Sequence, residues 1–335
     1  MNYIGSKLTL LPFLEKVFRQ VTDGSEKVFC DLFAGTGAVG RHFKSLGLQV
    51  IANDLQYYAY ALNKAYLEIN ETPAFTGLRA LSTQEPLAFI NELPGVAGFI
   101  TKHYSPAGGR MYYTAANAQK ADAIRQAIER WRIEKLLTEQ EYFYVLCSLL
   151  EAIDQVANTA SVYGAYLKKF KATALRPLRL KPLQLTNHVQ GCRAWQQDAN
   201  ELITQIECDV LYLDPPYNHR QYGANYHVLE TIAAYDSPQL KGVTGMREYP
   251  KSDYCRKGTA YTALENLIRN AKAKHLFVSY SDEGVLSLKD IQSVLKMRGK
   301  PKKFKKKYTR YKADNNRQYS KESTFEYLHY VRIQS

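Results

Sequence analysis

Short apolar runs typical of buried strands alternate with helical stretches near both ends of the chain. Residues 27–33 and 49–52 are strand-like, and the helical stretch between them ends at Gly47. The same rhythm returns later, with strand-like runs at residues 210–213 and 275–280. Strands that alternate with helices favour parallel pairing, because each helical crossover covers the sheet. The pattern therefore predicts an α/β fold.

Two further runs, residues 302–311 and 325–333, alternate apolar and polar positions around a polar link. This period of two predicts an antiparallel pair of strands at one side of the sheet. The lysines of the first run are typical of solvated edge-strand charges, and contact with phosphates stays open for them. A helix is also expected near the N-terminus, where Leu10, Leu14 and Phe18 recur at helical spacing.

The α/β rhythm stops in the middle of the chain. Residues 72–109 are rich in proline and glycine and predict turns, whereas residues 115–131 and 138–157 have helical periodicity. The length and the change of pattern predict an inserted, mainly helical subdomain. This division gives an insertion at residues 71–184 in a main domain of residues 1–70 and 185–335.

The stretch that follows these helices alternates basic and aromatic residues. Lys and Arg side chains neutralise phosphates, and Tyr or Phe rings stack on bases. A solvated connector is the alternative, but the positive charge of the whole chain favours nucleic-acid contact. The predicted nucleic-acid-binding residues are Lys168, Lys169, Lys171, Arg176 and Arg179.

Composition narrows the class of protein. With 45 Lys and Arg against 32 Asp and Glu, the formal net charge is +13. Such a charge favours a polyanionic partner, nucleic acid before an anionic membrane surface, although a merely basic protein has the same composition. The five cysteines lack CxxC spacing, so they indicate neither a disulfide framework nor a zinc site and fit a reducing cytoplasm. No signal-like segment and no apolar run near about 18 residues is present, which predicts no membrane span.

The apolar run at residues 210–213 stops at the sequence Asp-Pro-Pro-Tyr, residues 214–217. Two prolines in succession cannot continue a sheet ladder, because neither has an N–H to donate. Asp214 and Tyr217 therefore stand at the carboxyl edge of a strand, where open α/β sheets bind ligands. The structural alternative is a strand that ends in a rigid turn, with Asp214 as a local cap.

A glycine-rich turn follows the first strand. Gly35, Gly37 and Gly40 open a helix there, and Asp54 follows the second strand. The glycines allow the backbone to approach a ligand, and an acid at this distance is typical of a group that binds ribose hydroxyls. NAD and S-adenosylmethionine both contain an adenosine, so the motif indicates a nucleoside cofactor without choosing between them. A glycine-rich turn without a cofactor also fits.

Four motifs occur in one order: Tyr3-x-Gly5-Ser6-Lys7, DLFAGTG at residues 31–37, Asn53-Asp54, and DPPY at residues 214–217. With them the chain resembles the Dam-like, alpha-group family of S-adenosylmethionine-dependent DNA adenine-N6 methyltransferases. The resemblance covers about residues 1–70 and 185–335. It implies a Rossmann-like, seven-stranded methyltransferase sheet with the last strand antiparallel, and an inserted, mainly helical target-recognition subdomain.

The resemblance also implies a site for S-adenosylmethionine. Phe33, Gly35 and Gly37 would wrap its methionine and adenosine parts. Asp54 would hold the ribose hydroxyls, and Asp198 would lie near the adenine ring. Dam-like enzymes often have Trp where this chain has Tyr3, a change that still allows stacking. The residues implied to bind the cofactor are Tyr3, Lys7, Phe33, Gly35, Gly37, Asp54, Asp198 and Asp214.

The chemistry of adenine suggests roles for the DPPY residues. The exocyclic amine is a poor nucleophile and is paired within duplex DNA, so the base must be flipped out. We expect Asp214 and the Pro215 carbonyl to accept one N–H each and to orient the nitrogen lone pair toward the methyl group. Tyr217 would stack on the flipped base. The positive sulfur already activates the methyl group, so no metal is expected, and the seven histidines form no ligand cluster.

These motifs predict a site-specific DNA adenine-N6 methyltransferase of a restriction–modification or solitary methylation system. It would act on double-stranded DNA in the cytoplasm as a monomer or weak dimer. A cognate restriction endonuclease is a further candidate partner. An RNA base methyltransferase is the first alternative. An NAD-linked oxidoreductase and a non-enzymatic DNA-binding protein that retains the fold are the others.

Overall fold

The computed structural model of the chain describes residues 7–186, 189–218, 221–309 and 323–334. Tyr3, one of the predicted cofactor-binding residues, lies outside them. Contacts divide the chain into two compact units. Of the described residues, 7–55, 189–218, 221–222, 251–309 and 323–334 form the sheet unit, and 56–186 and 223–250 form the helical unit.

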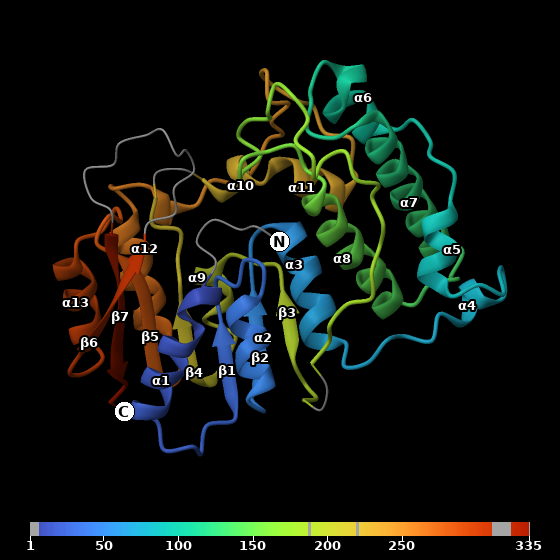
Figure 1. The fold of residues 1–335 in the computed structure, drawn as a ribbon. Coiled ribbons are helices and arrows are strands. Elements are labelled where there is room, and N and C mark those ends of the chain that lie inside the picture. The colour runs from blue at the N-terminus through green and yellow to red at the C-terminus, as the bar shows by residue number, and fades with distance from the viewer. Residues whose placement is uncertain (1–6, 187–188, 219–220, 310–322, 335) are drawn as a thin grey trace. The chain divides into compact units, whose positions relative to one another are not determined.

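A seven-stranded sheet in the order β3-β2-β1-β4-β5-β7-β6 forms the centre of the sheet unit (Figure 1). β7 runs antiparallel to both of its neighbours, and the pairs from β3 to β5 are parallel. The predicted α/β fold and antiparallel last strand are thus confirmed. The strands are β1 (Val28–Asp31), β2 (Gln49–Asn53), β3 (Arg193–Trp195), β4 (Cys208–Leu213), β5 (Ala273–Ser281), β6 (Lys302–Thr309) and β7 (Ser323–Arg332).

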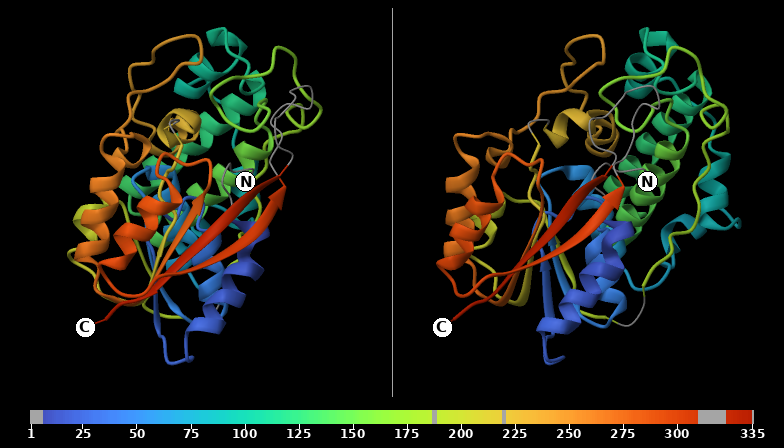
Figure 2. Two further views of the ribbon diagram at one scale, coloured as in Figure 1. Left: turned by 90° about the vertical axis from the view of Figure 1, so that its left-hand side faces the viewer. Right: turned by 60° about the vertical axis from the view of Figure 1, so that its left-hand side comes forward.

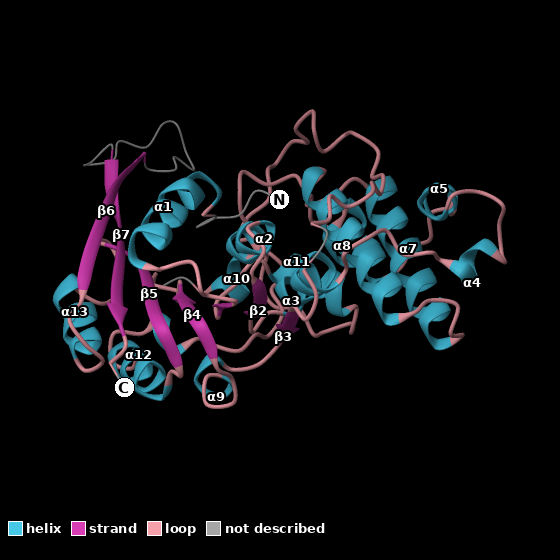
Figure 3. Cartoon of the chain, turned by 90° about the horizontal axis from the view of Figure 1, so that it is seen from below, coloured by secondary structure: helices cyan, strands magenta, loops and turns pink. Residues whose placement is uncertain are grey.

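Helices cover both faces of this sheet (Figure 3), which is why its central strands carry apolar residues in both directions. On one face, the stacked rings of Phe29 and Phe43 lie 3.9 Å apart, and Phe18 packs edge-on against Phe43. This face is covered by the turn η1 (Leu8–Leu10), α1 (Leu11–Val21) and α2 (Ala38–Ser45). The opposite face is covered by α9 (Ala199–Leu202), the turn η4 (Asp253–Cys255), α12 (Ala260–Asn270) and α13 (Leu288–Lys296).

β6 and β7 lie side by side as two long twisted strands (Figure 2). β6 is an edge strand, and its Lys303 and Lys305 are exposed, as predicted for edge-strand charges. β7 is an inner strand, and its Glu326 is buried. The register places Glu326 opposite Ser281 of β5 and Lys306 of β6. The last strand therefore brings one acidic side chain into the interior of the sheet unit.

The helical unit contains the two long helices that periodicity predicted. α8 begins with a capping box, in which the Thr138 hydroxyl and the Glu141 carboxylate each accept from the other residue's backbone N–H. No helix in the described part of the chain combines the length and apolar character needed to cross a bilayer. The elements are α3 (Tyr57–Asn63), a π-helical turn η2 (Lys64–Glu68), α4 (Thr76–Arg79), α5 (Pro86–Glu92), α6 (Phe99–Tyr104), a turn η3 (Pro106–Gly108), α7 (Ala115–Ile133), α8 (Glu139–Gln155), α11 (His227–Ala234) and all but the first residue of α10 (Tyr222–Asn225).

Residues 72–109, expected to be rich in turns, contain the short helices α4, α5 and α6 among their turns. The first turn of α6 is held by Asp122 of α7, which accepts from the backbone N–H groups of Gly98, Ile100 and Thr101. Because this cap comes from a distant helix, the local sequence around α6 has no start signal. The turn-rich composition therefore did not indicate this helix.

Residues 223–250 also fold with the helical unit. Arg110 donates to the carbonyls of Gly242 and Val243, and the Tyr112 and Tyr104 hydroxyls donate to the next two carbonyls. Side chains near α6 thus hold a loop that follows the DPPY sequence by more than twenty residues. The helical unit is therefore wider than the expected insertion at 71–184.

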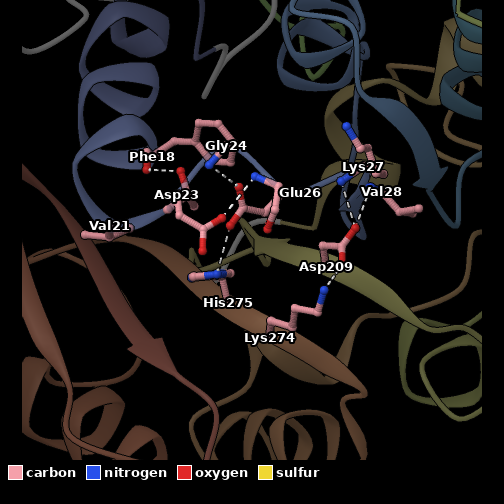
Figure 4. Close-up of polar contacts among 12 residues, drawn as sticks. Phe18, Val21, Asp23, Gly24, Glu26, Lys27, Val28, Asp209, Lys274 and His275 are labelled. Carbon is pink, nitrogen blue, oxygen red and sulfur yellow. Dashed lines mark hydrogen bonds and ion pairs between the residues drawn. The ribbon is translucent and has the colours of Figure 1, made fainter.

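At the amino edge of the sheet, Asp209 joins the beginnings of three strands (Figure 4). Its carboxylate accepts from the backbone N–H groups of Lys27 and Val28, at 2.8 and 2.9 Å, and lies 2.7 Å from the Lys274 ammonium. Nearby, His275 lies 3.2 Å from the Glu26 carboxylate. Burial opposes ionisation of Asp209, but Lys274 and the two amides outweigh it and lower the pKa to about 2.

We predict that Asp209→Ala lowers the free energy of unfolding by about 1–3 kcal/mol at pH 7, because two amides and a lysine lose their acceptor. The folded-state pKa of Asp209 is lowered, so its contribution is present above about pH 4 and is lost as the pH falls toward 2. In urea unfolding, the difference in free energy of unfolding between wild type and Asp209→Ala should therefore be smaller at pH 3 than at pH 7. Asp253→Ala, at an exposed aspartate, is the control and should stay near wild type.

Candidate active site

The DPPY turn is held in place at the carboxyl end of β4. β4 ends at Leu213, as predicted, and Asp214 follows it directly. The Tyr217 carbonyl accepts from the Val285 N–H at 2.9 Å, and the centroids of the Tyr217 and Tyr280 rings lie 5.3 Å apart. Hydrogen bonding and ring packing thus fix both the backbone and the side chain of Tyr217, whose ring stays partly exposed.

Lys7 lies between two carboxylates. Its ammonium is 3.1 Å from Asp214 Oδ1 and 2.8 Å from Glu326 Oε1, and it donates a hydrogen bond to Glu326. The Ser279 hydroxyl donates to the same Glu326 oxygen at 2.8 Å. Although burial disfavours the charged amine, the surrounding anionic groups, Asp214 first, raise the pKa of Lys7 well above its usual value. Lys7 is therefore a buried cation.

Asp214 Oδ1 is buried and accepts no hydrogen bond from the described residues. The Lys7 ammonium is close enough for a charge interaction, but it does not meet the angles of a hydrogen bond to this atom. Burial raises the pKa of Asp214 to about 6, Lys7 opposes that shift, and Glu326 adds to it. At neutral pH the carboxylate is thus mostly ionised and retains an acceptor position for an N–H donor.

The glycine-rich loop is built at the ends of β1 and β2. Gly35 and Gly37 have φ values of +52° and +75°, in the left-handed region that side chains with a Cβ avoid. The Gly35 N–H donates to Asp54 Oδ2 at 2.8 Å. The buried Asn53 amide donates to the Leu32 carbonyl and to the Gln197 carbonyl, which ties together the ends of three strands. The loop and Asp54 thus form one hydrogen-bonded edge.

Asp31, the last residue of β1, is a further buried acid that the predicted site did not include. Its Oδ2 accepts from Gly40 N–H at 3.2 Å, but its Oδ1 has no hydrogen-bond partner among the described residues. Burial, followed by the charge of Asp214, raises the pKa of Asp31 to about 8. The signal that located Asp214, an acid directly after an apolar run, also marks Asp31 in the sequence.

The structure gives Phe33 and Asp198 packing and capping contacts. The Phe33 ring lies 5.1 Å from the Tyr254 ring in an edge-on arrangement. The exposed Asp198 accepts from the N–H groups of Asn200 and Glu201 and caps α9. Neither contact tests the expected role in cofactor binding, which stays a prediction for both residues.

The predicted basic segment lies in the helical unit and has no regular secondary structure. Asn117 and Asn91 hold it through their side-chain amides, which pair with backbone groups at 174–178 and at 180. Lys171 is partly buried and donates to the Thr159 carbonyl at 2.7 Å. Exposed side chains remain at Lys168, Lys169, Arg176 and Arg179.

The structure brings Lys7 to Asp214 and Gly35 to Asp54. The predicted residues that lie in the sheet unit are Lys7, Phe33, Gly35, Gly37, Asp54, Asp198, Asp214, Pro215 and Tyr217. A family model described as D12 class N6 adenine-specific DNA methyltransferase matches residues 3–294. The chain belongs to this family.

Three relatives show how far the similarity of this D12 methyltransferase extends. It is 46% identical over 335 residues to the type II methyltransferase M.NlaIII of Neisseria lactamica, with 98% of each chain covered. It is 37% identical over 322 residues to the type II methyltransferase M.CviAII of Paramecium bursaria Chlorella virus 1, with 93% of each covered. It is 41% identical over 341 residues to the type II methyltransferase M.FokI of Planomicrobium okeanokoites, but spans only 52% of that protein.

Family membership decides between the alternatives that the sequence left open. The chain is a DNA adenine-N6 methyltransferase with a methyl donor and a DNA substrate, and the predicted function is confirmed. An RNA base methyltransferase, an NAD-linked oxidoreductase and a non-enzymatic DNA-binding protein do not fit this family. The roles of individual residues in this methyltransferase stay predictions.

The buried Asp31 gives a pH-dependent test of the site without any ligand. Its raised folded-state pKa, about 8, means that the folded protein loses stability as the pH rises from about 4 to 8. We predict that Asp31→Asn removes this loss, so the variant gains on the order of a few kcal/mol over wild type between pH 5 and pH 9. Denaturant unfolding of ligand-free protein at these pH values measures the difference. Asp253→Asn should follow the wild-type curve, and an Asp31→Asn curve parallel to wild type would contradict the prediction.

Proposed function

We propose that this methyltransferase transfers the methyl group of S-adenosylmethionine to the N6 of an adenine flipped out of a specific duplex site. The observation that carries this proposal is the Asp214 carboxylate. It stands at the end of β4, is mostly ionised at neutral pH, and has a buried Oδ1 without a hydrogen bond from the described residues. A buried acceptor without a donor is costly unless a ligand supplies the donor.

The groups at the ends of β1 and β2 fit S-adenosylmethionine by their chemistry. The cofactor carries positive charges on its ammonium and sulfonium groups, and Asp31 is a buried acid with an unsatisfied oxygen. Gly35 and Gly37 leave room for the cofactor against the backbone, and Asp54 would bind the ribose hydroxyls. When bound, the cofactor supplies a methyl group activated by its positive sulfur. We retain Tyr3, Lys7, Phe33, Asp198 and Asp214 as further residues expected at this site.

Asp214, Pro215 and Tyr217 would prepare the adenine. S-adenosylmethionine would supply the methyl group, and the adenine N6 would supply the lone pair that accepts it and would release one of its two N–H protons to solvent. Asp214 and the Pro215 carbonyl would each accept one N–H, which concentrates the lone pair and stabilises the growing positive charge. Tyr217, fixed by Tyr280 and by the Val285 N–H, would serve as a rigid stacking surface for the base.

The relatives named as type II methyltransferases and modification methylases suggest a biological setting. We propose that this chain is the modification enzyme of a restriction–modification system, with a cognate endonuclease that cuts the same sequence. A monomer or weak dimer and a cytoplasmic location stay predictions.

We predict that Asp214→Asn lowers the single-turnover rate of methyl transfer at least about 100-fold, because the amide is a weaker acceptor for the N–H and stabilises less positive charge. Binding of S-adenosylmethionine should change no more than severalfold. The rate is measured with labelled cofactor and duplex DNA. In a host that lacks adenine methylation, the wild type should mark one short sequence motif, and Asp214→Asn should not.

Asp253→Asn is the matched control, since it removes an exposed carboxylate on η4. Wild-type turnover by Asp214→Asn would overturn the proposed role of the DPPY turn. An equal loss of cofactor binding and rate would instead point to a damaged fold.

We also propose that the exposed part of the basic segment contacts DNA phosphates. Its exposed cations, anchored by Asn91 and Asn117 in the backbone around them, support this role. Replacing Lys168, Lys169, Arg176 and Arg179 together by Gln should weaken DNA binding. The slope of log K against log salt should become shallower by roughly 0.9 for each phosphate that the variant no longer neutralises.

The matched control replaces four exposed lysines of the sheet unit, Lys16, Lys272, Lys296 and Lys300. Fluorescence anisotropy of a labelled duplex at several salt concentrations gives both slopes. Equal slopes for the two quadruple variants would reduce the basic segment to a solvated connector.

A further inference from the structure

Glu326 is a buried acid of the site that neither the sequence motifs nor the family match points to. It lies on β7, beyond the residues 3–294 that the family model matches. Its carboxylate accepts from the Lys7 ammonium and from the Ser279 hydroxyl, both at 2.8 Å. We propose that Glu326 is a positioning residue, which holds the Lys7 ammonium away from full hydrogen bonding with Asp214. This inference rests on the proposed role of Asp214 as the acceptor for adenine.

The geometry of Lys7 is asymmetric between its two carboxylates. Toward Glu326 it makes a hydrogen bond, whereas toward Asp214 it makes a charge contact at 3.1 Å without hydrogen-bond angles. A carboxylate that accepts a short, charge-assisted bond from lysine is a poorer acceptor for a substrate amine. Because Glu326 accepts the hydrogen bond from Lys7, Asp214 keeps the charge interaction with Lys7, and its Oδ1 remains able to accept a hydrogen bond from the substrate amine.

Glu326 lies on an inner strand and is held by a side chain of the neighbouring strand β5. Ser279 of β5 donates to it, and Ser281 of the same strand lies opposite it in the register. Lys306 lies opposite on β6, but its ammonium donates to the Thr9 carbonyl at 3.1 Å. Since the Lys306 ammonium bonds to Thr9, the Glu326 carboxylate can accept its hydrogen bond from Lys7.

The charges around Asp214 make the role measurable. Lys7 is the cation that faces Asp214, and Glu326 and Asp31 are the acids that face it. The Tyr212 phenol interacts with Asp214 and with Lys7, and the Tyr217 phenol interacts with Lys7. Because the Glu326 charge raises the pKa of Asp214 and the Lys7 charge lowers it, removing Glu326 or Lys7 must move the protonation of Asp214 in opposite directions. A side chain that only packs would move neither.

The experiment follows single-turnover methyl transfer to duplex DNA from pH 5 to pH 9, with saturating S-adenosylmethionine. In Glu326→Gln, the midpoint of the acid limb of the pH–rate profile should move about one pH unit lower, because a negative charge beside Asp214 is lost. The plateau rate should fall roughly tenfold, because Lys7 then bonds to Asp214. The cofactor KM should stay within about twofold. In Lys7→Gln, the acid limb should instead move to higher pH.

Two further variants separate charge from position. Glu326→Asp keeps the charge but withdraws the carboxylate, so it should keep the wild-type acid limb and lose plateau rate. Glu265→Gln, which removes a surface carboxylate of α12 paired with Arg269, should match wild type in both. Thermal unfolding of each variant shows which of them are folded.

The outcomes are distinct. A folded Glu326→Gln with a wild-type acid limb, in a protein that Asp214→Asn inactivates, overturns this inference alone. Wild-type turnover by Asp214→Asn overturns the proposed function and removes the premise. If Glu326→Gln does not fold, Glu326→Asp decides, since a wild-type plateau rate in that variant rejects a positioning role and a reduced rate at an unchanged limb supports it.

Discussion

The site depends on one buried ammonium shared by two carboxylates. Lys7 is 5% exposed, and it lies between Asp214 at the end of β4 and Glu326 on β7. A buried ion pair loses much of its Coulomb energy to desolvation, so it is a weak source of stability. The ammonium links Asp214 after β4 to Glu326 on β7, and its charge lowers the pKa of Asp214.

The two ends of β4 show how the same residue type serves opposite purposes. Asp209, at the amino edge, has two amides and a lysine as donors, and its pKa is lowered to about 2. Asp214, at the carboxyl edge, has a buried oxygen without a donor among the described residues, and its pKa is raised to about 6. The satisfied aspartate stabilises the sheet, and the unsatisfied one suits a ligand. Asp31, with its pKa raised to about 8, extends that contrast to β1.

Local signals explain how much of the fold was predictable from sequence. Apolar period, glycines and the two prolines located β1, β2, β4, α7 and α8, because these features act within a few residues. Motif order then indicated the family, and with it Asp214 and the glycine-rich loop. The contact between Glu326 and Lys7 could not be predicted in this way, because the two residues are 319 positions apart in the sequence. Helix α6 was missed for the same reason, since its cap is Asp122 of another helix.

The position of β7 in the sheet affects the order in which the protein becomes competent during synthesis. β7 inserts between β5 and β6, so the last described strand to leave the ribosome is an inner one. Until β7 docks, Glu326 is not beside Lys7, and Asp214 is the one of the two carboxylates that can pair with the Lys7 ammonium. A nascent chain that has already folded its glycine-rich loop and DPPY turn would still hold an unfinished site. Methylation competence would then begin only once translation of the strand is complete, which would delay the appearance of modifying activity relative to the folding of the earlier strands.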